Sequence, residues 1–271
     1  MPRYRVDCQL TYDIAALPAD FIFTFEVAER MGQTIRHEAL TLSSCGTLDR
    51  YTDPATGNRF LRVAAQPGRL TLSYLAEVEK TRNRPPAGEP EIRVNALPLD
   101  VVPYIFPSRY CESDALTGLA GRLFGQVKPG HARVEAIVAW VRGNVDYQVG
   151  MTTSLTTARD VLMNRVGVCR DFAHVCIAFC RALNIPARIV TGYSHFDTPP
   201  PDFHAIFEAY LGNRWILFDP TEMAPLEDFI RIGTASDAAD VAFATLFGPI
   251  RMVSLVPEVT RLATTAQALA A

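Results

Sequence analysis

A run of prolines in the first half of the chain separates two kinds of sequence pattern. Six prolines fall between residues 85 and 107, and proline both ends regular structure and stiffens linkers. Before this stretch the residues favour strands, whereas after it apolar residues recur at helical spacing. The sequence therefore predicts an α+β protein. We expect an N-terminal β domain over residues 1–105, a mixed core over 106–240, and a C-terminal strand and tail over 241–271.

The first 105 residues contain several segments rich in strand-forming side chains. They are residues 21–27, 34–42, 59–63 and 70–78, and turn residues such as Asp53-Pro54 and Gly57-Asn58 stand between them. Several strands of this length separated by turns are typical of an antiparallel sandwich. No paired acid–base or nucleophile pattern occurs in this part of the sequence, so we expect the chemistry to lie in the core.

The core sequence alternates helical and strand patterns. Helices are expected over residues 131–142, from about 157 onward, and over 169–183, and strands over 187–193, 204–211, 215–219 and 250–256. In the helix over 169–183, apolar side chains recur at spacings of four, three and four, so they share one buried face.

Charge and composition exclude several classes of function. The net charge is −3, and 49% of the residues are hydrophobic, which gives no electrostatic reason to expect nucleic acid or an anionic membrane as partner. No segment reaches the roughly 18 consecutive apolar residues of a membrane helix, and the N-terminus lacks the apolar stretch of a secretory signal. We therefore expect a cytoplasmic protein with reduced cysteines. The oligomeric state cannot be read from the sequence.

Cys169 differs from the other cysteines in its place along the chain. It follows Gly167-Val168 and stands where a helix begins. The helix dipole and the unpaired backbone N–H groups at such a position favour a thiolate, which is the nucleophilic form of cysteine. The same N–H groups can hold an oxyanion. Cys169 is therefore the candidate nucleophile.

The remaining five cysteines are interpreted as structural. Cys176 and Cys180 lie within the same helix on or near its apolar side, where a buried cysteine behaves as a small hydrophobe, and Cys8, Cys45 and Cys111 stand alone. No Cys-x-x-Cys pair is present, which argues against a zinc knuckle or a thioredoxin-like motif.

His204 and Asp219 are the candidate partners of this thiolate. If Gly212-Asn213 forms a two-residue hairpin turn, then His204, Ile206 and Asp219 share one face of the sheet, because side chains alternate with period two. Asp219 is then the diagonal neighbour of His204, roughly 7–8 Å away at the backbone. We expect the carboxylate to accept from Nδ1–H and leave Nε2 to face the thiolate. A turn longer by one residue would break this arrangement.

Other residues remain open as alternatives at this site. His195 lies in the loop before His204 and is a reserve base, and Tyr147, ahead of the catalytic helix, is a candidate second oxyanion donor. A metal site built from His195, His204 and Asp219 is conceivable. It lacks a dense ligand cluster, so neither a metal nor another cofactor is expected.

Several spaced blocks of the sequence resemble the bacterial transglutaminase-like proteins. They are residues 167–173, 181–188, 192–193, 204–205 and 215–221, in the order in which that family has them. The resemblance covers roughly residues 110–240. It implies a papain-like α+β core with Cys169 as nucleophile, His204 as base and Asp219 as orienting group. It also suggests that residues 1–105 are the β domain that often precedes such cores.

The resemblance implies a cysteine enzyme that acts on peptide or glutamine-side-chain amide bonds of a protein or peptide substrate through a thioester. Water would resolve the thioester in a protease or deamidase, and an amine in a transglutaminase; hydrolysis is slightly favoured, since no amine-binding feature is recognisable. The alternative is a binding or scaffold protein that keeps the fold without turnover. Ile206 favours that alternative, because the family commonly has tryptophan two residues after the histidine.

Overall fold

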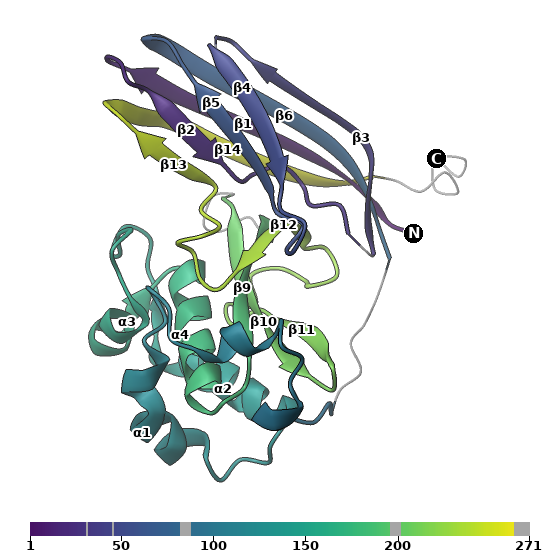
Figure 1. Ribbon diagram of the computed structural model, residues 1–271, viewed down its shortest axis with the longest axis vertical. Coiled ribbons are helices and arrows are strands. Elements are labelled where there is room, and N and C mark those ends of the chain that lie inside the picture. The colour runs from purple at the N-terminus through teal and green to yellow at the C-terminus, as the bar shows by residue number, and fades with distance from the viewer. Residues whose placement is uncertain (31, 45, 82–87, 196–201, 263–271) are drawn as a thin grey trace.

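The computed structural model describes residues 1–262 except 31, 45, 82–87 and 196–201. Its strands and helices form two units, a β sandwich and a mixed core, which lie one above the other in Figure 1. The four-stranded sheet of the core is antiparallel, like the two sheets of the sandwich. The expected α+β class, with an antiparallel sandwich and a mixed core, is confirmed.

The first sheet of the sandwich has the strand order β14-β1-β6-β3. Its strands are β1 (Arg3–Ile14), β3 (Gln33–Leu42), β6 (Gly68–Lys80) and β14 (Ile250–Leu262). Strand β1 was not expected from the sequence, although its apolar side chains alternate. Tyr4, Val6, Cys8, Leu10, Tyr12 and Ile14 are all buried, and this period of two turns one face of the strand toward the opposite sheet.

The second sheet has the order β13-β2-β5-β4. It contains β2 (Asp20–Phe23), β4 (Thr47–Thr52), β5 (Arg59–Ala64) and β13 (Ala244–Phe247). The strand expected over 21–27 ends at Phe23, because the following residues turn toward the core. There the carbonyl of Phe25 accepts a 2.7 Å hydrogen bond from the hydroxyl of Tyr193.

Strand pairing does not follow the division expected at residues 105 and 240. Strands β13 and β14 lie after the core in the sequence, but β13 pairs with β2 and β14 with β1. Residues 92–105 contain two short 3₁₀ helices, η1 (Val94–Ala96) and η2 (Val102–Ile105). They pack on Tyr210 and Trp215 of the core. The sandwich is therefore completed from both ends of the chain.

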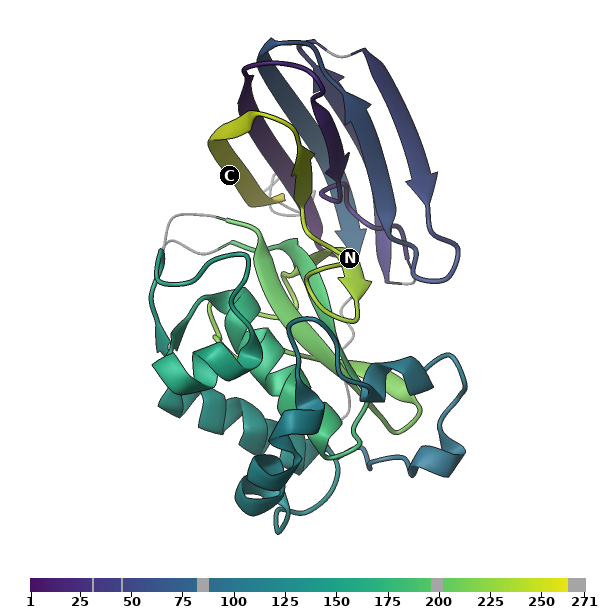
Figure 2. The same cartoon turned by 60° about the vertical axis from the view of Figure 1, so that its left-hand side comes forward.

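The core is a four-stranded sheet with helices on one face (Figure 2). The strand order is β11-β10-β9-β12, with β9 (Ala187–Tyr193), β10 (His204–Leu211), β11 (Arg214–Phe218) and β12 (Ile230–Ala235). Helix α4 (Cys169–Ala182) packs on the face formed by Ala205, Phe207 and Ala209. Around it lie α1 (Ser113–Phe124), α2 (His131–Asn144) and α3 (Ala158–Asn164), together with the short strands β7 (Asp146–Tyr147) and β8 (Val166–Gly167).

Sandwich and core share a continuous interior. Tyr193, Ile230 and Ile232 of the core sheet belong to the same buried apolar cluster as the sandwich side chains. The amide of Asn58 pairs with the backbone of Thr234 through bonds of 2.7 and 2.9 Å. Because buried polar groups at this junction are satisfied across it, the two units hold a fixed relation. No helix among the described residues is long and apolar enough to cross a bilayer.

Candidate active site

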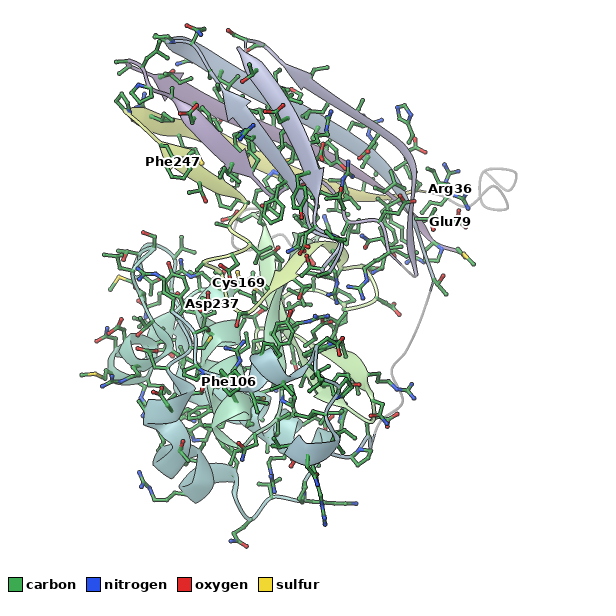
Figure 3. The ribbon with its side chains drawn as sticks, in the orientation of Figure 1. Arg36, Glu79, Phe106, Cys169, Asp237 and Phe247 are labelled. Carbon is green, nitrogen blue, oxygen red and sulfur yellow. The ribbon has the colours of Figure 1, made fainter. Side chains whose placement is uncertain are left out.

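Cys169 is the first residue of α4 and is partly exposed. The preceding Val168 is extended, and its N–H donates a 3.0 Å hydrogen bond to the carboxylate of Asp171, which caps the helix. A Cβ on Gly167 would lie 2.8 Å from the Cβ of Asp171, so the close return of this cap requires glycine. Figure 3 shows Cys169 on the side of the core that faces the sandwich. The thiol thus lies at a helix N-terminus, as the sequence predicted.

The carboxylate of Asp171 also fixes the neighbouring segment. It is fully buried and accepts from the hydroxyl of Thr152 at 2.7 Å and from both Nε and Nη2 of Arg170 at 3.0 and 2.7 Å. Nη2 of Arg170 also donates to the carbonyl of Thr153 at 2.8 Å. These bonds hold residues 152–153 against the start of α4 and so define one wall beside the thiol.

Tyr147 lies directly beside the candidate nucleophile. Strands β7 and β8 pair in parallel with Tyr147 opposite Gly167, and the hydroxyl of Tyr147 lies close enough to Cys169 to interact with it electrostatically. Burial, followed by the nearby Cys169 charge, raises the pKa of Tyr147. The hydroxyl therefore keeps its proton at neutral pH and can act as a donor.

His204 and Asp219 meet across the β10–β11 hairpin. The two-residue turn is confirmed, since Leu211 faces Arg214 and both Gly212 and Asn213 have positive φ, 54° and 61°. The side chain of His204 is 1% exposed, and its Nε2 lies 2.8 Å from Oδ2 of Asp219.

The expected assignment of the two ring nitrogens is wrong. Nε2 of His204, not Nδ1, binds the carboxylate. The imidazole also interacts electrostatically with the side chain of Cys169, and Nδ1 is the ring nitrogen that does not bind the carboxylate. Spacing along the sequence cannot reveal this choice, because it depends on how the ring is rotated about χ2.

Thr221 is a site residue that was not identified from the sequence. Its backbone N–H and hydroxyl donate to Oδ1 of Asp219 at 2.9 and 2.7 Å, while Oδ2 accepts from His204. The signal was present in Asp219-Pro220-Thr221, because an aspartate commonly accepts from the backbone two residues later. Both oxygens of the carboxylate are thereby fixed.

The electrostatics of the pair favour a protonated imidazole. Burial alone lowers the pKa of His204, but the hydrogen bond to Asp219 and the interaction with Cys169 outweigh it and raise the pKa to about 10. Burial raises the pKa of Asp219, whereas hydrogen bonds from His204 and Thr221 lower it, and the net direction is down. The buried imidazole beside Cys169 is therefore cationic at neutral pH and is held by the carboxylate of Asp219.

His195 and Ile206 differ from His204 in their exposure and packing. His195 is exposed just beyond the end of β9, whereas His204 is buried against Asp219. Ile206 is fully buried and packs with Val190 and Phe229 on the sheet face opposite α4. It therefore belongs to the buried packing of the sheet.

Four other cysteines are described by the structure, and all are buried. Burial raises the pKa of Cys8, Cys111, Cys176 and Cys180; Cys45 lies outside the described residues. Within the described part of the chain, no group of three or more His, Cys, Asp or Glu side chains is arranged to hold a metal ion.

Comparisons with known proteins agree with this fold. A sequence model of the transglutaminase-like superfamily matches residues 117–220. A crystal structure of a "Putative Cysteine Protease" from Cytophaga hutchinsonii has a TM-score of 0.90 and 38% identity, and the match covers 97% of this chain and 91% of that one. The chain belongs to the transglutaminase-like superfamily.

Mycobacterial relatives match only in part. An uncharacterized protein of Mycobacterium leprae is 31% identical over 144 residues, which is 50% of this chain and 51% of the relative. An uncharacterized protein of Mycobacterium tuberculosis is 29% identical over 170 residues, 58% of this chain and 52% of the relative. The chain thus spans about half the length of the curated relatives that it matches.

Proposed function

We propose that this protein is a thiol-dependent enzyme that acts on peptide or carboxamide bonds through a thioester on Cys169. The observation that carries the proposal is the buried imidazole of His204, which hydrogen-bonds to Asp219 at 2.8 Å and interacts electrostatically with Cys169. A nucleophile, a base and an orienting group connected in this order form the arrangement that acyl-transfer enzymes use.

The first half of the reaction follows from the protonation states. The Cys169 thiolate attacks the carbonyl carbon and forms a C–S bond, and the carbonyl electron pair moves to the oxygen. When the tetrahedral intermediate collapses, the C–N bond breaks and the imidazolium of His204 protonates the departing nitrogen. Ammonia or an amine leaves, a thioester remains on Cys169, and His204 is neutral. Asp219 holds the ring in place throughout.

We assign the oxyanion to a site between the backbone N–H of Cys169 and the hydroxyl of Tyr147. Tyr147 lies beside Cys169 at the start of the helix, and an oxyanion entering between the two donors would accept from both. Donors fixed before the reaction stabilise the developing charge without reorganising.

The second half resolves the thioester. Neutral His204 takes a proton from water, the resulting hydroxide oxygen attacks the thioester carbonyl, and the C–S bond breaks to give a carboxylic acid and the thiolate–imidazolium pair. An amine in place of water would give a new amide. We place hydrolysis first because water needs no docking site, whereas efficient transfer requires that an amine bind and water be excluded.

Product analysis tests this function. The full-length protein is incubated with a peptide library, with and without a primary amine, and the products are identified by mass spectrometry. Cleavage, deamidation or amine addition would each identify the reaction class. The product should disappear in Cys169→Ala and persist in Cys176→Ala, which removes a buried thiol from the same helix. If the wild-type protein gives no product from any peptide, the protein is not an enzyme of this class.

A further inference from the structure

A phenylalanine from a distant loop packs against the imidazole of His204. Phe229 immediately precedes β12, is 3% exposed, and its ring centroid lies 6.2 Å from that of His204 at an interplanar angle of 67°. It also packs with Ile206 and Val190 on the same face of the sheet. The phenyl ring therefore packs as an apolar wall beside the imidazole of His204. The polar interactions of that imidazole are with Asp219 and Cys169.

The backbone opposite His204 leaves room for this ring. Gly192 is the cross-strand partner of His204. A Cβ at Gly192 would lie 2.4 and 2.7 Å from ring carbons of Phe229 and 2.4 Å from the carbonyl oxygen of Ile230. Such distances are far below van der Waals contact, so the ring can occupy this place only because residue 192 is glycine.

The β sandwich holds the backbone of this phenylalanine. Lys80 ends strand β6, and its Nζ donates to the carbonyl of Phe229 and, at 2.7 Å, to that of Glu227. The hydroxyl of Tyr4 in β1 donates to the carboxylate of Asp228. Two strands of the sandwich thus hold three consecutive residues of the core, 227–229, and these lead directly to the ring beside His204.

We propose that Phe229, held by Lys80 of the β sandwich, is a positioning residue that fixes the imidazole of His204 toward Cys169 and Asp219. The inference rests on the proposed function, because it assumes that Cys169 is the nucleophile. It gives the sandwich a role in the reaction itself. Rotamers of catalytic side chains have to be fixed by packing, since a displacement of about 1 Å can cost as much as about 100-fold in rate.

A merely structural role for Phe229 would affect stability but not the thiolate–imidazolium pair. The readout that separates the two is the pH profile of Cys169 alkylation by iodoacetamide, measured by peptide mapping, because thiolate alone reacts. The variants are Phe229→Leu, which keeps apolar bulk but removes the flat ring, and Lys80→Met, which keeps the stem but removes the donors. Lys128→Met is the matched control, since Lys128 is the other lysine of the chain and is exposed.

We expect both variants to move the acid midpoint of the alkylation profile upward by about one pH unit, and to slow alkylation at pH 6 about tenfold. Lys128→Met should reproduce the wild-type profile. Near-UV circular dichroism confirms that each variant is folded; should Lys80→Met fail to fold, Phe229→Leu carries the test alone.

Two results would overturn the inference in distinguishable ways. If Cys169 of the wild-type protein labels no faster than a model thiol at pH 6, the proposed function fails and this inference with it. If the wild-type protein shows the enhanced rate and folded Phe229→Leu keeps the same profile, His204 is positioned without the phenylalanine and only the inference fails.

Discussion

Oδ2 of Asp219 lies 2.8 Å from Nε2 of His204, while Oδ1 of the same carboxylate is held by Thr221. Asn at position 219 would keep the shape but could not stabilise an imidazolium. We therefore expect Asp219→Asn to lower kcat/KM by about 10²- to 10⁴-fold on whichever substrate the product analysis identifies. Asp146→Asn, at an exposed aspartate, is the matched control. If Asp219→Asn kept the wild-type kcat/KM, Asp219 would not be the group that orients His204.

The raised pKa of His204 predicts a pH-dependent contribution to stability. Its folded pKa is about 10, above the ordinary value of 6.5. The contribution is therefore complete below about pH 6.5 and disappears as the pH rises through 10. Urea unfolding of wild-type protein and His204→Gln measures it between pH 6 and 10. The difference in free energy of unfolding between the two should shrink as the pH increases, and a constant difference would contradict the assigned shift.

Asp171 is expected to affect both stability and reactivity. Its buried carboxylate caps α4 and binds Thr152 and Arg170, so Asp171→Ala should cost about 1–3 kcal/mol of unfolding free energy and slow the alkylation of Cys169. Asp160→Ala removes a cap from α3, where Asp160 accepts from the N–H of Thr157 at 2.9 Å. Asp160→Ala should lower stability in thermal unfolding. It should leave the alkylation rate of Cys169, followed by peptide mapping, unchanged. Equal effects of the two variants on Cys169 would count against a specific role for Asp171.

A buried carboxylate in β10 joins three strands of the core sheet. Glu208 accepts from Arg188 at 2.7 Å and from two nitrogens of Arg231 at 3.0 and 2.5 Å. Removing its charge leaves two largely buried guanidinium groups without their partner, so Glu208→Gln should lower the free energy of unfolding by about 3–5 kcal/mol. Glu135→Gln, at an exposed ion pair, should change it by less than about 1 kcal/mol. Comparable losses in the two variants would show that the buried network contributes little.

The parts of the site that could be predicted depend on local patterns. The position of Cys169 at a helix start and the hairpin that joins His204 to Asp219 follow from turn chemistry and strand alternation over fewer than 20 residues. The same alternation of apolar side chains is present in β1, so the sequence could also have predicted this strand. Its six alternating side chains are all buried.

What could not be predicted depends on contacts between distant segments. The contact of Lys80 with Phe229 joins residues 149 positions apart, and β14 pairs with β1 across the whole chain. Neither contact leaves a signal in a short window of sequence, because each is decided by how the sandwich and core pack. The same holds for the choice of ring nitrogen in His204.

The central claim is that His204 activates Cys169, and the relative alkylation rates of all six cysteines test it most directly. The protein is treated with iodoacetamide at pH 7, and each cysteine is followed by peptide mapping in the wild-type protein and in His204→Ala. The account predicts that Cys169 is labelled far faster than the other five and that its rate falls in His204→Ala. Slow, uniform labelling of all six cysteines, or a Cys169 rate that is unchanged in His204→Ala, would contradict it.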